Sequence, residues 1–407
     1  MQTISPIGMI VVFSLFLCVG QTLFSSSLLL KSFFRERNVA NLYLFFFMVT
    51  TCSILSLYYL FDFWLRELPH FILSYTPLLP AVPVSLYLYT RAITSSNRFR
   101  HTWALGAHFL PCLIVFMAML PFYFLPGIEK IEWLFFRNSN YITMSDTQVF
   151  TSRVIPLLII AIVGHGLCYT YLIVRLIRKH ESSISNRFSY MEGVNLAWLK
   201  YISFTIFALY IAYPLLKYFP IFNRNPNLFW IASVVTGCSF ISIFAFFGVT
   251  QRPILSIARN EYLNIDVAPS ENIEQSEPII GRDSQPHDDQ LLDQIASHIV
   301  NLMEQKKLYL NPKLNIGELS EAAGLPTKDI SKAINSCLKK NFMEFINDYR
   351  IQDAKVLLAD DPDVNVLQLA FEVGFNSKTA FYEAFRRVTG STPSQYRRSI
   401  SKPTQPA

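Results

Sequence analysis

Two ten-residue stretches near the C-terminus decide how this chain is interpreted. The first reads Asn315-Ile-Gly-Glu-Leu-Ser-Glu-Ala-Ala-Gly324, and the second reads Asn365-Val-Leu-Gln-Leu-Ala-Phe-Glu-Val-Gly374. Each begins with an asparagine that can cap a helix and has a Glu or Gln three residues later, close to a capping box. Each ends with a glycine, the residue that most easily ends a helix at positive φ. The stretches are offset by 50 residues and predict two copies of one helix–turn–helix unit.

A short polar turn and a second amphipathic helix follow each stretch. Ile330 and Ile334 line this helix in the first unit, and Phe381 and Phe385 match them at an offset of 51, so the second turn is one residue longer. Apolar residues recur at helical spacing throughout the region. The predicted inward positions are Leu292, Ile295, Ile299 and Leu302 before the first unit; Ile316, Leu319, Ala323, Ile330, Ile334, Cys337 and Leu338 within it; Phe342, Phe345, Ile346, Tyr349, Ala354, Leu357 and Leu358 in a long connecting helix; and Val366, Leu369, Ala370, Val373, Phe381, Phe385, Val388 and Tyr396 in and after the second unit.

The helix that begins near Asp288 has two possible roles. Its apolar positions can form a seam between two copies of the chain or a face of the domain core. Two turns of seam are short for a coiled coil, so the core face is the favoured interpretation.

Composition divides the chain near Val249. The 407 residues are 52% apolar and only 16% charged, against about 25% charged in ordinary globular proteins. Before Gln251 there are 17 basic and 8 acidic residues, and from Gln251 onward there are 18 basic and 21 acidic residues. The first part is thus very apolar and basic, and the second is ordinary in composition. Two parts that face different solvents are expected.

The six cysteines do not suggest a shared site. Five of them lie in apolar runs (Cys18, Cys52, Cys112, Cys168 and Cys238), Cys337 lies in the polar part, and no two have CxxC spacing. Neither a disulfide framework nor a zinc site is expected. We interpret the cysteines as small buried apolar residues and predict no metal or other cofactor.

Seven apolar runs in the first part are long enough to cross a bilayer, which takes about 20 residues. They cover residues 7–30, 42–61, 71–90, 103–124, 154–174, 198–218 and 228–249. The loops after the first, third and fifth runs, with the start of the tail, hold 12 basic residues, and the other loops hold 6. The excess of positive charge marks the cytoplasmic side. We therefore expect a multi-pass protein of the bacterial inner membrane with its N-terminus outside and its C-terminus in the cytoplasm.

Five residues in these runs are candidates for sensing a signal. Pro77, Pro80 and Pro83 recur in the third run and should kink it. His108 and His165 lie in the fourth and fifth runs, where an ionisable side chain is a candidate site. The alternatives are that neighbouring helices tolerate the prolines and that each imidazole only bonds to a neighbouring helix.

The C-terminal part resembles the DNA-binding domain of the AraC/XylS family of bacterial transcription regulators. The matching strings are Asn365–Gly374, then Phe375-Asn-Ser-Lys-Thr-Ala-Phe-Tyr-Glu-Ala-Phe-Arg-Arg387, and Gly390-Ser-Thr-Pro-Ser-Gln-Tyr-Arg397. The resemblance implies two helix–turn–helix modules joined by a long helix, each with its second helix in the major groove. A groove about 12 Å wide admits one helix, so two modules reach two groove segments.

Exposed positions of the two second helices are the predicted DNA contacts. For base edges these are Thr327, Lys328, Ser331, Lys332 and Asn335 in the first module and Lys378, Thr379, Tyr382, Glu383 and Arg386 in the second. Arg387, Arg397 and Arg398 are the predicted phosphate contacts, together with Lys402. The alternative for each single charge is a solvated surface residue.

The apolar part also resembles the multi-span region fused to some regulators of this family. The strings are Tyr87-Leu-Tyr89, His108-Phe-Leu-Pro111 and Arg187-Phe-Ser-Tyr-Met-Glu-Gly-Val-Asn-Leu-Ala-Trp198. This resemblance implies a sensor without naming its ligand. The strand pattern of a cupin-like sugar-binding domain is missing from the sequence, so sugar binding is not expected.

The expected fold is all-α, a seven-helix transmembrane bundle with a cytoplasmic all-helical domain that holds two helix–turn–helix modules. The expected domains are a membrane sensor (1–250), a flexible linker (251–287), the DNA-binding domain (288–402) and a tail (403–407).

The expected function is a membrane-bound one-component transcription regulator. Its expected partners are double-stranded DNA, the bilayer, a signal ligand, a second copy of the chain and, for an activator, RNA polymerase. The alternative is a transporter or receptor with a protein-docking tail. Glycine-rich phosphate loops are missing from the sequence, so no enzyme is expected.

Overall fold

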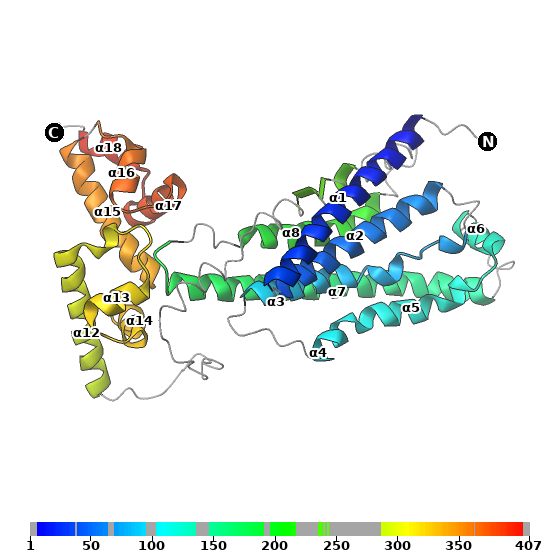
Figure 1. Cartoon of the computed structure of the whole chain (residues 1–407), viewed down its shortest axis with the longest axis horizontal. Coiled ribbons are helices and arrows are strands. Elements are labelled where there is room, and N and C mark those ends of the chain that lie inside the picture. Colours follow the sequence, from blue (N-terminus) through cyan, green and yellow to red (C-terminus); the bar gives the residue numbers. More distant parts are fainter. Residues whose placement is uncertain are drawn as a thin grey trace, which may run out of the picture. The chain divides into compact units, whose positions relative to one another are not determined.

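The computed structural model describes residues 6–36, 39–63, 69–94, 103–135, 146–190, 196–216, parts of 235–243, 286–361 and 363–401 (Figure 1). Every regular element in these residues is a helix, and a single antiparallel bridge joins Phe188 to Asn315. The expected all-helical fold is therefore confirmed for the described residues. The chain forms two compact units. The N-terminal unit comprises Met1–Ile177 and Leu196–Ile257, and the C-terminal unit comprises Arg178–Asn195 and Ala258–Ala407.

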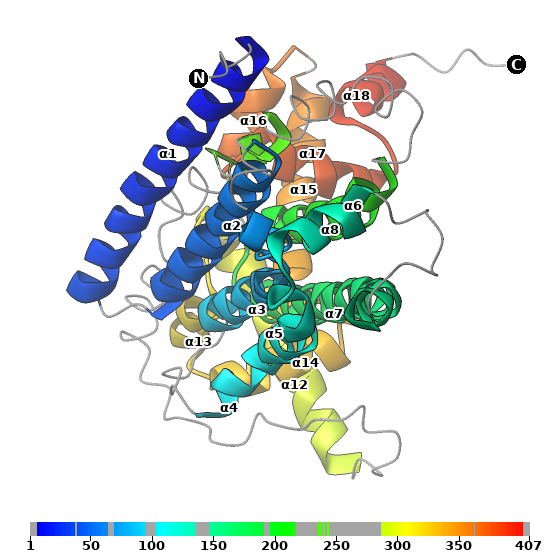
Figure 2. The same cartoon turned by 90° about the vertical axis from the view of Figure 1, so that its right-hand side faces the viewer.

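The N-terminal unit is built from apolar helices of very different lengths. The helix α1 packs along α2, and α2 packs along α3 (Figure 2). The elements are α1 (Pro6–Glu36), α2 (Val39–Phe63), η1 (Pro69–Phe71), η2 (Thr76–Leu78), α3 (Ala81–Thr94), α4 (Trp103–Gly106), η3 (Ala107–Phe109), α5 (Leu110–Tyr123), α6 (Gly127–Phe135), α7 (Asp146–Ser185) and α8 (Ala197–Leu216). With 40 residues, α7 continues past residue 177 into the C-terminal unit.

Four segments among the described residues are long and apolar enough to cross a membrane: Phe16–Arg35, Val39–Tyr58, Pro69–Thr94 and Asp146–Ser185. They fall in the first, second, third and fifth predicted runs. The fourth and sixth runs contain shorter apolar helices, Ala107–Tyr123 and Trp198–Leu209. The seventh run lies mostly outside the described residues. The seven-span arrangement therefore stays a prediction.

The third run differs from a single kinked helix. Phe71 ends η1, Thr76–Leu78 form η2, the other residues before Ala81 form turns, and the α-helix begins only at Ala81. Pro77 and Pro80 precede α3, and Pro83 lies in its first turn. Because proline has no N–H to donate, the helical ladder cannot run through all three positions, whereas the first turn of a helix tolerates proline.

The cysteines differ from the expectation in burial and in pairing. Cys52 is buried as expected, but Cys112 and Cys337 are half-buried and Cys168 is exposed. Cys52, Cys112, Cys168 and Cys337 are free, as expected of isolated residues. Cys18 is disulfide-bonded, and the expectation was wrong there. Spacing along the sequence cannot reveal a pairing between residues that only the fold brings together.

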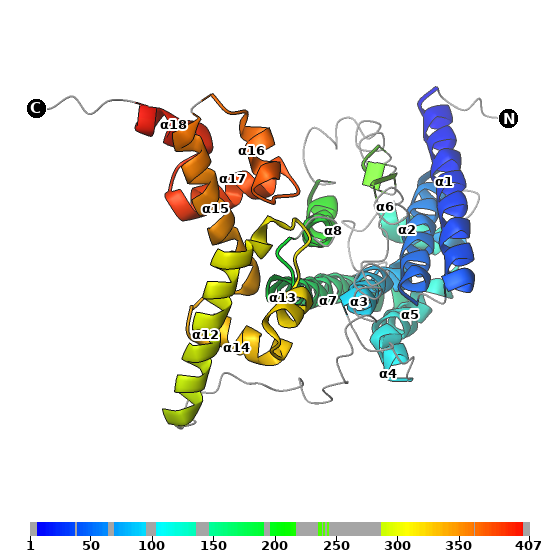
Figure 3. The same cartoon turned by 60° about the vertical axis from the view of Figure 1, so that its left-hand side comes forward.

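The helix α15 (Phe342–Asp360) joins two groups of helices in the C-terminal unit (Figure 3), and each group has its own apolar core. The first core joins α12 (Pro286–Lys306), η5 (Leu308–Leu310), α13 (Ile316–Ala323) and α14 (Thr327–Ser336) to Phe342, Phe345 and Ile346 of α15. The second core joins α16 (Val366–Glu372), α17 (Lys378–Thr389) and α18 (Pro393–Ser401) to Ile351, Ala354 and Leu358 of α15.

The predicted inward faces of these helices are confirmed, because each side chain named for them lies in or against one of the two cores. The face of α12 formed by Leu292, Ile295, Ile299 and Leu302 is buried in the first core. The core interpretation of this helix is therefore correct, and the same face does not serve as a seam between copies.

Candidate nucleic-acid interface

Two helix pairs, α13–α14 and α16–α17, carry the residues predicted to contact DNA, and local capping fixes where each pair begins. The Asn315 side chain accepts hydrogen bonds from the amides of Gly317 (2.8 Å) and Glu318 (3.0 Å). The Glu318 carboxylate accepts one in return from the Asn315 amide (3.3 Å), which completes the capping box. Asn365 caps α16 through the amides of Leu367 and Gln368. The predicted asparagine caps are therefore present at both helices, and the first is a complete capping box.

The predicted glycine ends also occur, although the two glycines have different surroundings. Gly324 ends α13 at φ 66°, and a Cβ there would meet open space. Gly374 has φ 93°, and a Cβ there would lie 2.7 Å from the Tyr309 carbonyl oxygen and 2.9 Å from that of Leu310. Position 324 requires glycine only because of its backbone conformation. Position 374 requires glycine also because there is no space for a side chain.

The second helices, α14 and α17, each present a polar outer face over a buried apolar one. Ile330, Ala333 and Ile334 of α14 are buried, as are Phe381, Ala384 and Phe385 of α17. Most of the residues predicted to contact bases lie on the outer faces. Lys328, Lys332, Asn335, Lys378, Thr379, Glu383 and Arg386 are exposed, and Thr327, Ser331 and Tyr382 are half-buried. Their role in base contact stays a prediction.

Contacts within each helix hold some of these side chains. The Asn335 amide donates to the Ser331 carbonyl oxygen (2.8 Å), one turn earlier in α14. The Lys378 ammonium lies over the Tyr382 ring, 5.4 Å from its centroid, one turn apart in α17. Side chains ordered before binding lose less conformational entropy when they contact a ligand.

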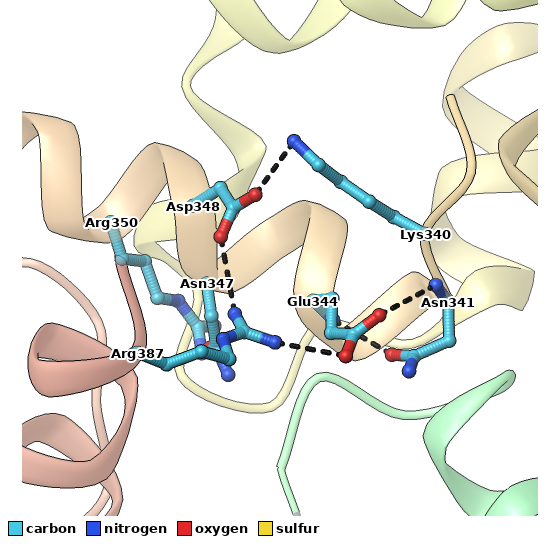
Figure 4. A network of polar contacts seen from close by, with 7 residues as sticks. All are labelled: Lys340, Asn341, Glu344, Asn347, Asp348, Arg350 and Arg387. Atoms are coloured by element: carbon cyan, nitrogen blue, oxygen red, sulfur yellow. Dashed lines mark hydrogen bonds and ion pairs between the residues drawn. The ribbon is translucent and has the colours of Figure 1, made fainter. Parts of the chain in front are cut away.

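Two of the predicted phosphate contacts already have partners in the chain. Arg387 of α17 binds Glu344 and Asp348 of α15, at 3.1 Å each, and Lys340 binds the other oxygen of Asp348 at 2.7 Å (Figure 4). Arg397 of α18 donates to the Val364 carbonyl oxygen. Arg398 is exposed. Sequence reasoning missed the intramolecular roles of Arg387 and Arg397, because their partners lie 33 to 43 positions away along the chain.

In the N-terminal unit, the structure brings the two candidate histidines together around a tyrosine. The Nδ1 atom of His108, in η3, lies 2.6 Å from the hydroxyl of Tyr169 in α7. The His165 ring, one turn earlier in α7, has its centroid 4.6 Å from that of Tyr169. Tyr87 of α3 packs against both His108 and Tyr169. The sequence did not mark Tyr169 as a candidate residue. Tyr87 was named only as part of the Tyr87–Tyr89 match to the multi-span regulators.

Known proteins match this chain in its C-terminal unit. Residues 319–399 match the family described as a helix-turn-helix domain. An uncharacterised HTH-type transcriptional regulator of Staphylococcus aureus strain MSSA476 is 34% identical over 91 residues, which are 22% of this chain and 12% of that protein. The uncharacterised HTH-type transcriptional regulator YdeC of Bacillus subtilis is 28% identical over 108 residues, 26% of this chain and 37% of that protein.

The chain thus aligns with well under half of either regulator's length. A solved structure, the C-terminal domain of AraT, a response regulator from Geobacillus stearothermophilus, covers 29% of this chain and 88% of that chain at 21% identity, with a TM-score of 0.22. The family match coincides with α13 to α18 and the outer faces of α14 and α17. Residues 319–399 are therefore a helix-turn-helix domain of the kind found in bacterial HTH-type transcriptional regulators.

Proposed function

We propose that this chain is a membrane-bound one-component transcription regulator. One observation carries the proposal: a single chain holds both a helix-turn-helix domain and four helical segments long and apolar enough to cross a membrane. The domain would bind promoter DNA from the cytoplasmic side of the bacterial inner membrane, and the helices would hold it there. The proposal involves no catalytic step.

Exposed apolar side chains support the lipid environment. On α1, Phe16, Leu23 and Phe24 are 72%, 65% and 66% exposed, and on α7, Leu157 and Ile160 are 66% and 69% exposed. An apolar surface of this extent is unfavourable in water and is typical of helices that face lipid or another protein. With the excess of basic residues in alternate loops, it favours a multi-pass protein whose C-terminus is cytoplasmic.

The two helix pairs would act as two DNA-reading modules. In each pair the second helix has a buried apolar face and an outer face of Lys, Thr, Ser, Asn or Arg, residue types that bond to base edges and phosphates. The shared helix α15 has 19 residues and is about 28 Å long at 1.5 Å per residue. That length is comparable to the helical repeat of DNA, about 34 Å, which separates successive major-groove segments on one face.

The signal would enter through the apolar helices. The cluster of Tyr87, His108, His165 and Tyr169 offers hydroxyl and imidazole groups to a polar ligand, and it joins α3, η3 and α7. A ligand that changes these contacts would shift the positions of the helices that carry them. A second copy of the chain and, for an activator, RNA polymerase are further proposed partners.

The decisive experiment is selection of DNA by the full chain in lipid nanodiscs from a library of randomised duplexes. We expect one sequence to be enriched and to bind with a logarithm of affinity that falls linearly with the logarithm of salt concentration. Failure of any sequence to rise above the input would contradict the proposal and favour a protein-docking tail. Digestion of a C-terminal tag in inside-out vesicles, but not in intact spheroplasts, would support the cytoplasmic orientation.

A further inference from the structure

The residues that follow α7 pair with the backbone that leads into α13. The Ile316 amide donates to the Arg187 carbonyl oxygen (2.9 Å), and the Ser189 amide donates to the Leu314 carbonyl oxygen (3.1 Å). Phe188 and Asn315 form the antiparallel bridge between these bonds. Residues 187–190, here called the α7 arm, therefore belong to the C-terminal unit although they continue a helix of the N-terminal unit.

Ser189 is the central contact of the α7 arm. It is 2% exposed, and its hydroxyl donates to the Leu314 carbonyl oxygen at 2.7 Å. The same hydroxyl oxygen accepts from Arg350 Nη2 (3.3 Å), and the Ser189 carbonyl oxygen accepts from Arg350 Nη1 (3.4 Å). The Ser189 hydroxyl thus gives a hydrogen bond to one buried acceptor, the Leu314 carbonyl oxygen, and takes one from a buried donor, Arg350 Nη2.

Arg350 of α15 is 1% exposed and connects several segments of the C-terminal unit. Its Nε donates to the Tyr309 carbonyl oxygen (2.7 Å), and its Nη2 donates to that of Asn311 (2.8 Å). Nη1 also reaches the Asn347 side chain (3.3 Å) within α15. The planar guanidinium has five N–H groups in a fixed fork, so its orientation depends on where all of these acceptors lie.

The guanidinium also contacts the turn of the second helix pair. Its Cζ lies 5.5 Å from the centroid of the Phe375 ring, beside Gly374. Close by, the Asn376 side chain donates to the Pro312 carbonyl oxygen (2.8 Å). Arg350 therefore touches the α7 arm, the segment before α13 and the turn between α16 and α17. These three segments are the one that follows α7, the one that leads into the first helix pair, and the turn inside the second helix pair.

The α7 arm is held to the end of α7 by hydrogen bonds. The amides of Arg187 and Phe188 both donate to the Ile184 carbonyl oxygen, at 2.9 Å each. The arm is thus held to the last turn of α7, and a displacement of that turn would move Ser189 with it. The chain passes between the two units at residues 177/178, 195/196 and 257/258, and the first of these points lies inside the continuous helix α7.

We propose that the α7 arm transmits a movement of the apolar helices to the helix-turn-helix domain. Arg350 is the positioning residue: its orientation depends on where Ser189 lies, and it determines how the two helix pairs are placed relative to each other. The inference rests on the proposed function. When the arm is seated, Arg350 has acceptors on every side, and both pairs are held at one spacing. When α7 withdraws Ser189, the buried guanidinium loses two acceptors and must reorient. The turn at Phe375 then loses its support, and the spacing of the pairs relaxes.

The test measures dependence on the spacing of the DNA half-sites, which a purely structural role would not change. The full chain in nanodiscs is titrated with its selected duplex and with versions in which one base pair is inserted or deleted between the half-sites. For Ser189→Ala we expect affinity for the selected duplex to fall about tenfold, with a smaller loss on the altered spacings. Arg350→Lys, which keeps the charge without the fork, should behave in the same way. Ser182→Ala, at an exposed serine of α7, is the control and should behave as wild type.

An equal loss of affinity on every spacing in both variants would mean lower stability alone and would overturn the inference. Amide hydrogen exchange of the full chain without DNA gives a second readout. Ser189→Ala should increase exchange at Ile316 and also at Phe375 and Asn376, and unchanged exchange at Phe375 and Asn376 would equally overturn the inference. If the wild type selects no DNA, the proposed function fails, and the exchange measurement still decides whether the arm is coupled to the second pair.

Discussion

Arg387 of α17 lies 3.1 Å from Asp348 of α15, and the same guanidinium lies 3.1 Å from Glu344 (Figure 4). Arg387 and its neighbour Arg386 are both exposed, so the ion pairs, and not burial, distinguish the two residues. Two adjacent arginines of one candidate recognition helix therefore have different surroundings. Arg387 has its charge balanced by carboxylates and holds α17 to α15, whereas Arg386 lies on the surface where DNA is expected.

This difference predicts opposite effects of the two arginines on salt dependence. Arg386→Ala should reduce the slope of log affinity against log salt by up to about 0.9, because it removes one positive charge from the surface predicted to face DNA. Arg387→Ala should leave the slope unchanged and lower the free energy of unfolding by about 1 kcal/mol or less, because its ion pairs are partly solvated. Electrophoretic shifts at several salt concentrations measure the slope. A lower slope for Arg387→Ala would assign that residue to a phosphate instead.

The exposed lysines of the two outer faces should each contribute to DNA affinity. Lys328→Ala and Lys378→Ala, one in each helix pair, are each expected to weaken binding of the selected duplex about tenfold. Lys306→Ala is the matched control, because Lys306 is an exposed lysine at the end of α12, outside both pairs. Titration of the full chain in nanodiscs measures all three. Wild-type affinity in both Lys328→Ala and Lys378→Ala would show that DNA lies against another surface.

Two glycines with similar φ should differ in their tolerance of alanine. Gly324→Ala is expected to cost about 1 kcal/mol of unfolding free energy, the cost of a left-handed backbone for an L-residue. Gly374→Ala should cost at least about 3 kcal/mol, because the new methyl group would also overlap the Tyr309 and Leu310 carbonyls. The C-terminal unit also includes the α7 arm, so exchange of buried amides of this unit, in the full chain in nanodiscs, measures these changes. Equal costs at the two positions would mean that the backbone at Tyr309 moves away.

Sequence patterns predicted the helices of the C-terminal unit well, for a physical reason. Burial of one helix face repeats every three or four residues, so Ile330 and Ile334, or Phe381 and Phe385, reveal their common side without knowledge of their partners. Capping is equally local, because Asn315 and Glu318 satisfy each other's backbone groups within one turn. One local signal was overlooked: Asn341 and Glu344 form a second complete capping box at the start of α15.

The contacts between segments were not predictable from the sequence. Arg350 sits between Tyr349 and Ile351 in a helix, where an arginine is normally a surface residue. Its acceptors are mostly backbone carbonyls, which every residue possesses, at positions about 40 and 160 residues away. No residue type or spacing marks such a partner. Ser189 and Tyr169 were missed for the same reason, because their importance comes from what the fold places beside them.

The same placement of segments gives Tyr309 an unusual pKa. Its ring is 3% exposed, and its hydroxyl donates to the Asp353 carboxylate at 2.8 Å. Burial first, and then the hydrogen bond and charge of Asp353, raise the pKa of Tyr309 above 10. The folded chain therefore keeps this proton at a pH where the unfolded chain releases it. The stability from Tyr309 is complete below pH 10 and is lost as pH rises above that value.

Tyr309→Phe should accordingly have two separable effects on the C-terminal unit of the full chain. At pH 8 it should lower the free energy of unfolding by about 1 kcal/mol, the contribution of one hydrogen bond to a charged acceptor less the lower cost of burying Phe. Between pH 9.5 and 11 the wild type should lose stability more steeply than the variant, because only the wild type has this proton to release on unfolding. Lys307 pairs with the same Asp353 oxygen at 3.6 Å, so both proteins are compared in a Lys307→Ala background, where the difference between their urea midpoints isolates Tyr309. Parallel pH profiles would show that the hydroxyl reaches water and that Asp353 is not its partner in solution.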